Sequence, residues 1–494
     1  MVNIVPDPAG TVPDTDVRRR RWELLVVGAG TAGLLAAQTA ASFGVRVLLV
    51  DRGTWGGECL WTGCVPSKAL IAAGEAAAAA RGAAEFGVHA DGVRIDGAAV
   101  LDRVREAVRT IEPVDSPRAQ RDAGIAVATG DLVFTGPDAA ELDGHRLRFR
   151  QAVVATGSAP SVPPVPGLAE AGPLTTETLW DEPALPGRLV VLGGGTTGCE
   201  LGQAMARLGV DVHLVETADR LLPAEDPAAS GLVTAALERD GVTVHLGAEV
   251  RRVTGGPGST RLALADGSEL ACDRVLVATG RRAARGRLGL AAAGVACDEA
   301  GWVTVDRHLR TSNPRIWAAG DVTGQPPYTH LAGLHGSTVA ANAVLGLRRT
   351  VDLTALPRVT FTQPEVAAVG APTGSAGEAG LRVVEQDHRH ADRAITDRRT
   401  DGVTRLAVDS RHRVRGATVV GPRAGETLAE LTLAVTQGLT TSDLTGATHP
   451  YPTYADPVWQ AAIGDYRARL AAPVPRRALR ALRRLRRLRL ALPG

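Results

Sequence analysis

Two stretches of the chain repeat the same order of apolar and polar positions. Residues 23–51 run from an apolar strand pattern (ELLVVGAG) through an alanine-rich helical pattern (TAGLLAAQTAASFG) to a second strand (VRVLLVD), and residues 188–216 repeat this order. Short apolar runs bounded by glycines are typical of strands buried in a parallel sheet, and the periodic stretch between them predicts a crossover helix. The pattern therefore predicts an α/β fold with two similar βαβ units.

A second repeat involves two strands that end in Ala-Thr-Gly, QAVVATGSAP at 151–160 and RVLVATGRRA at 274–283. Each follows one of the βαβ units, and the proline-rich stretch 159–167 predicts a linker. Beyond about residue 351, alternating strand patterns and one long helix predict an α+β module. The expected organisation is a flexible N-terminus (1–22), a first domain (23–160 and 281–350), a second domain (161–280), a third domain (351–470) and a basic tail (471–494).

The composition is that of an ordinary globular protein, with 494 residues, 45% hydrophobic and 22% charged. The most apolar long segment, 24–50, holds four glycines and Arg46, so strand and helix patterning explain it better than a membrane span does. The N-terminus lacks the apolar region of a secretory signal. We therefore expect no transmembrane helix and a cytoplasmic location, where a close cysteine pair is more often catalytic or metal-binding than structural.

The net charge of +2 hides an uneven distribution. From Arg467 to the end the chain has ten arginines and no acidic residue, which leaves a net charge of −8 on the remainder. An acidic body argues against nucleic-acid binding. The tail's leucines, three apart from Leu479 to Leu488, spread around a helix instead of forming one narrow stripe. A solvated, partly helical tail and a weak contact with an anionic membrane surface both agree with this pattern.

The turns of the two βαβ units carry the dinucleotide fingerprint GxGxxG. Its glycines are Gly28, Gly30 and Gly33 in the first unit, and Gly193, Gly195 and Gly198 in the second. The first glycine of each set permits a tight turn, the second lets the backbone approach a pyrophosphate, and the third lets the helix pack on the strand. Asp51 and Glu216, at the tip of the second strand of each unit, are placed to accept a hydrogen bond from a ribose hydroxyl.

Two fingerprints in one chain indicate two different dinucleotides, one held permanently and one exchanging. A flavin and a nicotinamide are the natural pair, because a flavin accepts a hydride and releases electrons singly or in pairs. An acid at position 216 favours a free 2′-hydroxyl, and therefore NAD(H) over NADP(H). The nearby Arg220 favours NADP(H) instead.

The stretch GGECLWTGCVPSKAL (56–70) holds Cys59, Cys64 and the chain's only lysine, Lys68. The cysteine spacing is wider than Cys-x-x-Cys, and no second pair or histidine accompanies it, so no metal site is expected. The spacing agrees with a redox-active disulfide at the start of a helix, and also with two unconnected buried thiols. The other cysteines, Cys199, Cys272 and Cys297, are scattered and read as core residues.

This stretch resembles the redox-disulfide motif of the flavin-dependent pyridine nucleotide-disulfide reductases, which include dihydrolipoyl dehydrogenase, glutathione reductase and mercuric reductase. Both fingerprints, both Ala-Thr-Gly strands, TSNPRIWAAGDVTG (311–324) and PRVTFTQPEVAAVG (357–370) are also similar to that family, in the same order over residues 23–460. The resemblance implies an FAD domain interrupted by an NAD(P) domain, then an interface domain that forms a homodimer.

The resemblance also implies roles for individual residues. Cys64 would be the thiol nearest the flavin and Cys59 the exposed thiol that attacks the substrate. Lys68 would lie beside the flavin N5 and pair with Glu200, because a compact cation fits a confined site better than a guanidinium does. The remaining predicted FAD and nucleotide contacts are Asp321, which would accept from the ribityl chain, and the glycines Gly157 and Gly280 of the Ala-Thr-Gly strands.

The chain departs from the family near its end. Thiol-specific members carry His-Pro-Thr-x-x-Glu, whereas this chain reads THPYPTYADP, with Tyr451 at the histidine position and Asp456 at the glutamate position. His449 lies two residues earlier and would need a rearranged turn to substitute. A tyrosine with a pKa near ~10 is a poor base at neutral pH, so dithiol-specific activity is disfavoured.

Three functions follow from these patterns. The first is NAD(P)H-dependent reduction, through FAD and a Cys59–Cys64 disulfide, of a small disulfide, a metal ion or a similar acceptor. The C-terminal cysteine pair expected of a true mercuric reductase is missing, since no cysteine follows Cys297. The second function is an NAD(P)H:quinone-type reductase that uses the flavin directly. The third is a lipid-docked or redox-sensing flavoprotein.

Overall fold

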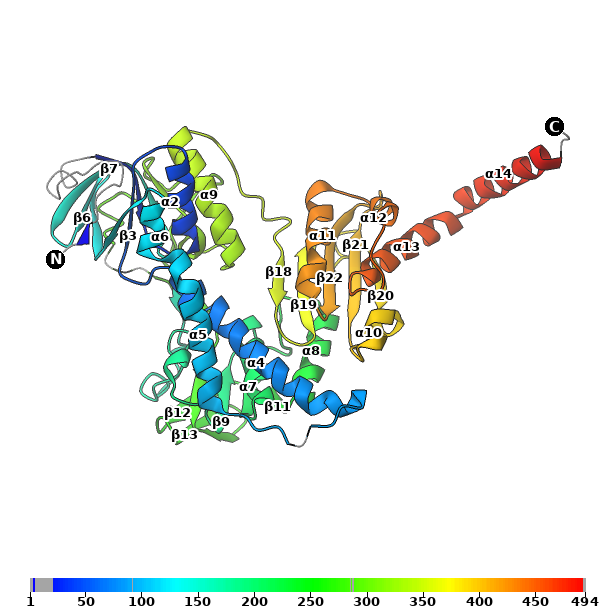
Figure 1. Cartoon of the computed structure of the whole chain (residues 1–494), viewed down its shortest axis with the longest axis horizontal. Coiled ribbons are helices and arrows are strands. Elements are labelled where there is room, and N and C mark those ends of the chain that lie inside the picture. Colours follow the sequence, from blue (N-terminus) through cyan, green and yellow to red (C-terminus); the bar gives the residue numbers. More distant parts are fainter. Residues whose placement is uncertain (1–2, 5–20, 91, 285, 287, 492–494) are drawn as a thin grey trace. The chain divides into compact units, whose positions relative to one another are not determined.

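The computed structural model describes residues 3–4, 21–90, 92–284, 286 and 288–491. The chain divides into two compact units (Figure 1), the first made of Met1–Asp219 and Asp240–Val351 and the second of Arg220–Arg239 and Asp352–Gly494. Most of the N-terminal segment 1–22, predicted to be flexible, lies outside the described residues.

An eight-stranded sheet forms the centre of the first unit. Its order is β1-β4-β3-β2-β7-β6-β5, with β17 also paired to β7. The strands are β1 (Asn3–Ile4), β2 (Arg21–Val27), β3 (Val47–Asp51), β4 (Ala126–Thr129), β5 (Leu132–Gly136), β6 (Ala139–Leu142), β7 (His145–Val154) and β17 (Ile316–Ala318). The parallel pairing of β2 with both β3 and β7 places the first fingerprint at the carboxyl end of a central strand, where doubly wound sheets bind their ligands.

Two helices lie side by side against this sheet (Figure 1), α2 (Thr31–Ser42) and α9 (Thr329–Leu345). Their backbones approach closely because Gly336 has no side chain: a Cβ there would lie 2.3 Å from the Ala32 carbonyl oxygen. The buried face of α2 is largely alanine, which lets the helix fit tightly between the strands and α9. Larger side chains on this face would move the start of α2 away from the turn that it completes.

The second βαβ unit builds a parallel sheet with order β11-β10-β9-β15. Its strands are β9 (Arg188–Leu192), β10 (Asp211–Val215), β11 (Val242–His245) and β15 (Arg274–Val277), and a three-stranded antiparallel sheet of β12 (Val250–Thr254), β13 (Thr260–Leu264) and β14 (Glu269–Cys272) accompanies it. Helix α7 (Thr196–Arg207) is the crossover from β9 to β10. The prediction of an α/β fold with two Rossmann-like units is therefore confirmed.

The remaining elements of the first unit join these two sheets. The helices are α3 (Gly57–Trp61), α4 (Cys64–Gly82), η1 (Ala83–Phe86), α5 (Gly97–Asp115), α6 (Pro117–Asp122), η2 (Leu179–Asp181) and η3 (Gly320–Thr323), and the strands are β8 (Ser158–Pro160) and β16 (Arg281–Ala283). Helix α4 packs on α7, and β8 pairs with β16, so the two Ala-Thr-Gly segments meet in one ribbon.

The second unit is an antiparallel sheet with helices packed on it, apart from the last helix of the chain, which contacts the helix before it. The sheet order is β18-β19-β22-β21-β20, made of β18 (Arg358–Thr360), β19 (Glu365–Gly370), β20 (Arg382–Asp387), β21 (Val403–Val408) and β22 (Val414–Gly421). The helices are α8 (Pro227–Arg239), η4 (His388–His390), α10 (Asp392–Thr396), α11 (Ala424–Gln437), α12 (Thr441–Gly446), α13 (Asp456–Ala471) and α14 (Pro473–Ala491). Among the described helices, none is both long and apolar enough to cross a membrane.

Candidate active site

The two fingerprint turns have the same internal geometry. In the first, a carboxylate oxygen of Asp51 accepts the N–H of Ala29 at 2.8 Å, and in the second, Glu216 accepts the N–H of Gly194 at 2.6 Å. Each acid therefore binds the residue that follows the first glycine of its own turn. This bond fixes each turn against the end of the neighbouring strand, and the two repeated sequence units form it in the same way.

The first and third glycines of each turn leave no room for a side chain. A Cβ at Gly33 would lie 1.8 Å from the Gly28 carbonyl oxygen, and one at Gly198 would lie 1.9 Å from that of Gly193. Gly28 and Gly193 also adopt positive φ angles, 104° and 107°, which disfavour any other residue. These contacts bring the first turn of α2 and of α7 directly against the preceding strand, and the N-terminus of a helix placed in this way favours an anion.

Two adjoining cavities open at the first fingerprint. The larger, of about 570 Å³, is lined by Gly28, Asp51 and Ser158 among others, and the smaller by Cys59, Cys64 and Asp321. They share four lining residues, namely Gly30, Glu58, Ala155 and Gly157. An elongated ligand can therefore run from the acid of the fingerprint to the cysteine pair. A glycine turn, a helix N-terminus, an acid at the tip of β3 and an adjoining pair of cysteines fit a flavin dinucleotide.

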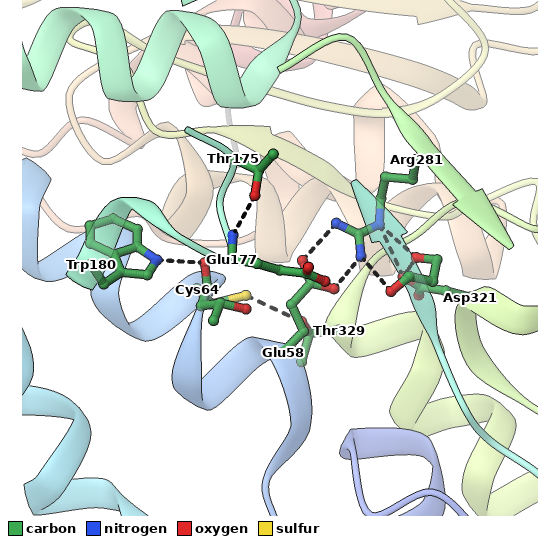
Figure 2. Close-up of polar contacts among 10 residues, drawn as sticks. Glu58, Cys64, Thr175, Glu177, Trp180, Arg281, Asp321 and Thr329 are labelled. Atoms are coloured by element: carbon green, nitrogen blue, oxygen red, sulfur yellow. Dashed lines mark hydrogen bonds and ion pairs between the residues drawn. The ribbon is translucent and has the colours of Figure 1, made fainter. Parts of the chain in front are cut away.

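Helix α3 carries Cys59, and α4 begins at Cys64; both are free thiols, and Cys64 is exposed whereas Cys59, expected to be the exposed thiol, is only partly exposed. The Cys64 sulfur lies 3.3 Å from the Thr329 hydroxyl at the start of α9 (Figure 2). A hydrogen bond from the Cys59 thiol lowers the pKa of Cys64 to about 6, with further help from the hydroxyl of Thr329 and the charge of Lys68. The same hydrogen bond and burial raise the pKa of Cys59, so Cys64 is the thiol that ionises first.

The chain's only lysine pairs with a buried acid. The Lys68 ammonium donates to Glu200 at 2.8 Å, with 38% of the lysine side chain exposed and 4% of the glutamate. Lys68 stands one turn into α4 and Glu200 in the first half of α7, two helices that pack together. At Gly74 in α4 a Cβ would lie only 3.2 Å from Ala204 of α7, which shows how closely the two helices pack.

An arginine that the sequence analysis missed links the cysteine loop to Asp321 (Figure 2). Arg281 donates through two nitrogens to both carboxylate oxygens of Glu58, and its Nε donates to the Ser158 hydroxyl at 2.6 Å. Ser158 in turn donates to Asp321 at 2.7 Å, and the arginine lies 3.6 Å from the same carboxylate. Burial raises the pKa of Glu58, although the charge of Arg281 opposes the shift.

A sequence signal for this network existed. Ser158 and Arg281 each follow the glycine of an Ala-Thr-Gly segment, Gly157 and Gly280, and these repeated segments pair as β8 and β16. Gly157 lines both cavities, whereas the Gly280 carbonyl accepts the Ser161 N–H at 2.9 Å in the ribbon. When two equivalent positions of an internal repeat lie at the same site, their side chains are candidates for a common function there.

The residues predicted near the end of the chain lie in the second unit. Tyr451 is 68% exposed and donates to Asp392 at 2.5 Å, which raises the pKa of the tyrosine. The nearly buried ring of His449 forms a hydrogen bond of 2.8 Å with Glu430, which lies on α11, whereas Asp392 lies on α10. Asp456 begins α13, and burial raises its pKa. The structure therefore holds Tyr451 and His449 against different acids and does not place His449 at the tyrosine's position.

Within the described residues, no three His, Cys, Asp or Glu side chains gather in a way that could hold a metal ion. The cysteine pair is accompanied by a hydroxyl and a lysine instead. These neighbours favour thiolate chemistry at the site.

Comparison with known proteins agrees with this geometry. Residues 22–336 match the family described as pyridine nucleotide-disulphide oxidoreductase, and residues 356–462 match its dimerisation domain. Mercuric reductase of Streptomyces lividans is 37% identical over 454 residues, covering 89% of this chain and 95% of that protein. Dihydrolipoyl dehydrogenase of Chlamydia muridarum is 33% identical over 446 residues, covering 89% and 95%.

A solved structure shows the same fold. The HOCl-induced flavoprotein disulfide reductase RclA from Escherichia coli has a TM-score of 0.78 at 27% identity, covering 88% of this chain and 98% of that one. The family match spans more than half of the chain and includes both fingerprints, the cysteine pair and the Lys68–Glu200 pair. The chain therefore belongs to the pyridine nucleotide-disulphide oxidoreductase family and is an oxidoreductase that uses FAD and NAD(P)H.

Proposed function

We propose that this enzyme passes electrons from NAD(P)H to a small disulfide, a metal ion or a similar acceptor through a disulfide formed by Cys59 and Cys64. The observation that carries the proposal is that both cysteines line the cavity that Gly30 and Asp321 also line. A redox pair in the predicted flavin site belongs in the electron path, whereas a structural pair has no need of that position. Asp321 and the first fingerprint would hold the FAD, and the second fingerprint would hold the nicotinamide dinucleotide.

Bound FAD supplies a two-electron carrier between the nicotinamide and the cysteine pair. The disulfide takes two electrons and one proton, so its S–S bond breaks to give a Cys64 thiolate and a Cys59 thiol. Hydrogen bonds from Cys59 and Thr329 and the charge of Lys68 stabilise that thiolate. With a disulfide acceptor, deprotonated Cys59 attacks one acceptor sulfur and releases the other as a thiol. Cys64 then attacks Cys59, which reforms the original disulfide and releases the second thiol.

The C-terminal segment of each subunit, which holds Tyr451, would complete the active site of the other subunit. We propose a homodimer, supported by the match of residues 356–462 to a dimerisation domain. Asp392 raises the pKa of Tyr451, so the tyrosine hydroxyl stays protonated at neutral pH and suits donation of a hydrogen bond, not removal of a proton. This favours an acceptor that needs no strong base from the protein over the oxidation of a dithiol.

The acceptor class can be tested directly. Steady-state oxidation of NADH would be measured with a small disulfide, a soft divalent metal ion with excess thiol, and a soluble quinone. We expect the disulfide or the metal ion to be reduced and to depend on the cysteine pair. Quinone reduction that persists without the pair would support the alternative, direct transfer from the flavin.

Glu216 is expected to select NADH. Its carboxylate accepts N–H groups of Gly194 and Ala218, which holds it at the tip of β10 where a ribose 2′-phosphate would meet its charge. We predict a kcat/KM at least about 10-fold higher for NADH than for NADPH. Glu216→Ser should narrow that ratio, mainly by lowering KM for NADPH. Equal kcat/KM values for the two nucleotides in the wild type would contradict this assignment.

Glu58 is expected to act as a positioning residue for FAD, because it anchors the arginine that contacts Ser158 and Asp321. Glu58→Ala should make FAD dissociate about tenfold faster, since a charge-assisted hydrogen-bond pair contributes on the order of 1.5–3 kcal/mol. The release of FAD after dilution, followed by its fluorescence, measures this. Glu58→Gln keeps the shape and one acceptor oxygen, so it should be intermediate. FAD retention equal to wild type in Glu58→Ala would contradict the role.

A further inference from the structure

The last helix of the chain leaves its apolar side chains uncovered. Helix α14 begins at Pro473, directly after α13 ends, and extends away from the five-stranded sheet of the second unit (Figure 1). Every side chain from Arg476 to Leu490 is exposed. Three of its leucines, Leu482, Leu485 and Leu488, are 60%, 56% and 64% exposed. A helix that no described part of the chain covers, with five exposed leucines, points to a partner.

The helix has two distinct faces. At about 100° per residue, six arginines fall within an arc of about 120°. They are Arg476, Arg477, Arg480, Arg483, Arg484 and Arg487. A second arc of about 120°, centred about 140° from the first, holds apolar residues, and Leu479 and Leu490 lie in neither arc. The apolar residues of the second arc are Val474, Ala478, Ala481, Leu482, Leu485 and Leu488, and only Arg489 interrupts them. The leucines do spread around the helix, as the sequence predicted, but the arginines that occupy the other side make it amphipathic.

We infer that α14 docks this enzyme on the surface of a membrane that contains anionic lipids. A basic face opposite a leucine face suits a helix lying in the headgroup region, with the leucines in the acyl boundary and the arginines on lipid phosphates. The helix carries too much charge to cross the bilayer. From Arg467 onward the chain contributes ten positive charges and no negative charge, which matches an anionic surface.

Other occupants fit these faces less well. A nucleic acid would use the arginines but would leave the leucines in water. A second copy of α14 would cover the leucines but would bring two sets of arginines together without an acid to pair them. A lipid surface uses both faces, and a dimer would carry two such helices, so that binding of one raises the effective concentration of the other.

The test uses the full-length holoenzyme and vesicle flotation. Vesicles of phosphatidylcholine alone and vesicles that also contain phosphatidylglycerol would be compared at physiological salt. Three variants are matched: deletion of 473–494, Leu482→Gln with Leu485→Gln and Leu488→Gln, and Arg480→Gln with Arg484→Gln and Arg487→Gln. Glutamine retains helix propensity, so each triple variant changes one face and leaves the helix formed, which circular dichroism checks.

We expect the holoenzyme to float with the anionic vesicles and not with the neutral ones. The deletion should abolish flotation, and each triple variant should weaken binding at least about tenfold. Absence of flotation by the full chain would overturn the inference. Undiminished binding of the leucine variant would also overturn the inference, because the arginines alone would then bind any polyanion. Competition by duplex DNA would reveal such binding. FAD reduction by NADH should be the same in all variants, so this test is independent of the proposed electron path.

Discussion

Cys59→Ser is expected to lower turnover of the acceptor by roughly 1,000-fold while FAD binding and its reduction by NADH persist. A serine hydroxyl cannot form a disulfide with Cys64, so electrons would stop at the flavin. Both cysteines line the cavity of Gly30 and Asp321, so the expected loss is one of electron transfer and not of folding. Steady-state turnover and stopped-flow reduction of the flavin by NADH, measured on one preparation, separate the two steps.

The other cysteines provide the controls. Cys64→Ser should lose turnover to a similar extent, since both sulfurs are needed to form one bond. Cys297→Ser is the matched control, because Cys297 is exposed, so the expectation of a core position was wrong for this cysteine, and it lies outside the residues that line the cavity. It should turn over as wild type. Full turnover in Cys59→Ser would remove the pair from the electron path and make direct transfer from flavin to a quinone the leading function.

Lys68→Met is expected to lower turnover by about 100-fold, the usual cost of losing one charged group aimed at a site of developing negative charge. The ammonium helps to lower the pKa of Cys64 to about 6, so its removal should raise that pKa. The thiolate is lost as pH falls through the pKa of Cys64. In reduced enzyme, the long-wavelength absorbance of a thiolate beside oxidised FAD should therefore disappear at a higher pH in the variant than in the wild type.

Two further variants separate charge from packing. Lys68→Met leaves the buried Glu200 carboxylate without its partner, which destabilises the fold in addition to any effect on the thiolate. The double variant Lys68→Met with Glu200→Gln removes both charges, so it should recover thermal stability but not turnover. Lys68→Arg keeps the charge on a wider group and should be intermediate. Turnover equal to wild type in the double variant would show that the Lys68–Glu200 pair has a structural role only.

The local features of the site could be predicted from the sequence because each lies within one continuous motif. Gly28, Gly33 and Asp51 belong to a single strand-turn-helix-strand unit whose geometry is set over short distances, and the second unit repeats it. The Lys68–Glu200 pair joins two such motifs, and it was expected only because the family resemblance connects them. The ion pair at 2.8 Å agrees with that expectation.

The repeat of the Ala-Thr-Gly segments points to Ser158 and Arg281, but the contact between Glu58 and Arg281 could not be predicted from one continuous motif. Its partners are 223 residues apart, and neither belongs to a motif that implies the other. It exists because β8 and β16 pair at the edge of the smaller cavity, and this pairing depends on how both nucleotide-binding units fold. The same limit applies to Tyr451, whose partner Asp392 lies on a separate short helix.

The two faces of α14 could not be predicted from the sequence for a different reason. Spacing of the leucines alone suggested a drifting pattern, because four residues three apart do rotate around a helix. The arginines fill the gaps on the opposite side, so the two faces are visible only when both residue types are placed on one helix with known bounds.

The central claim is that the Cys59–Cys64 pair exchanges electrons with FAD, and anaerobic titration of the oxidised holoenzyme with NADH tests it most directly. The flavin and the disulfide each accept two electrons, so we predict that full reduction consumes two equivalents of NADH per subunit. A long-wavelength absorption band should appear after the first equivalent, as the Cys64 thiolate forms beside the flavin. Complete bleaching by one equivalent, without that band, would contradict the claim and place the cysteines outside the electron path.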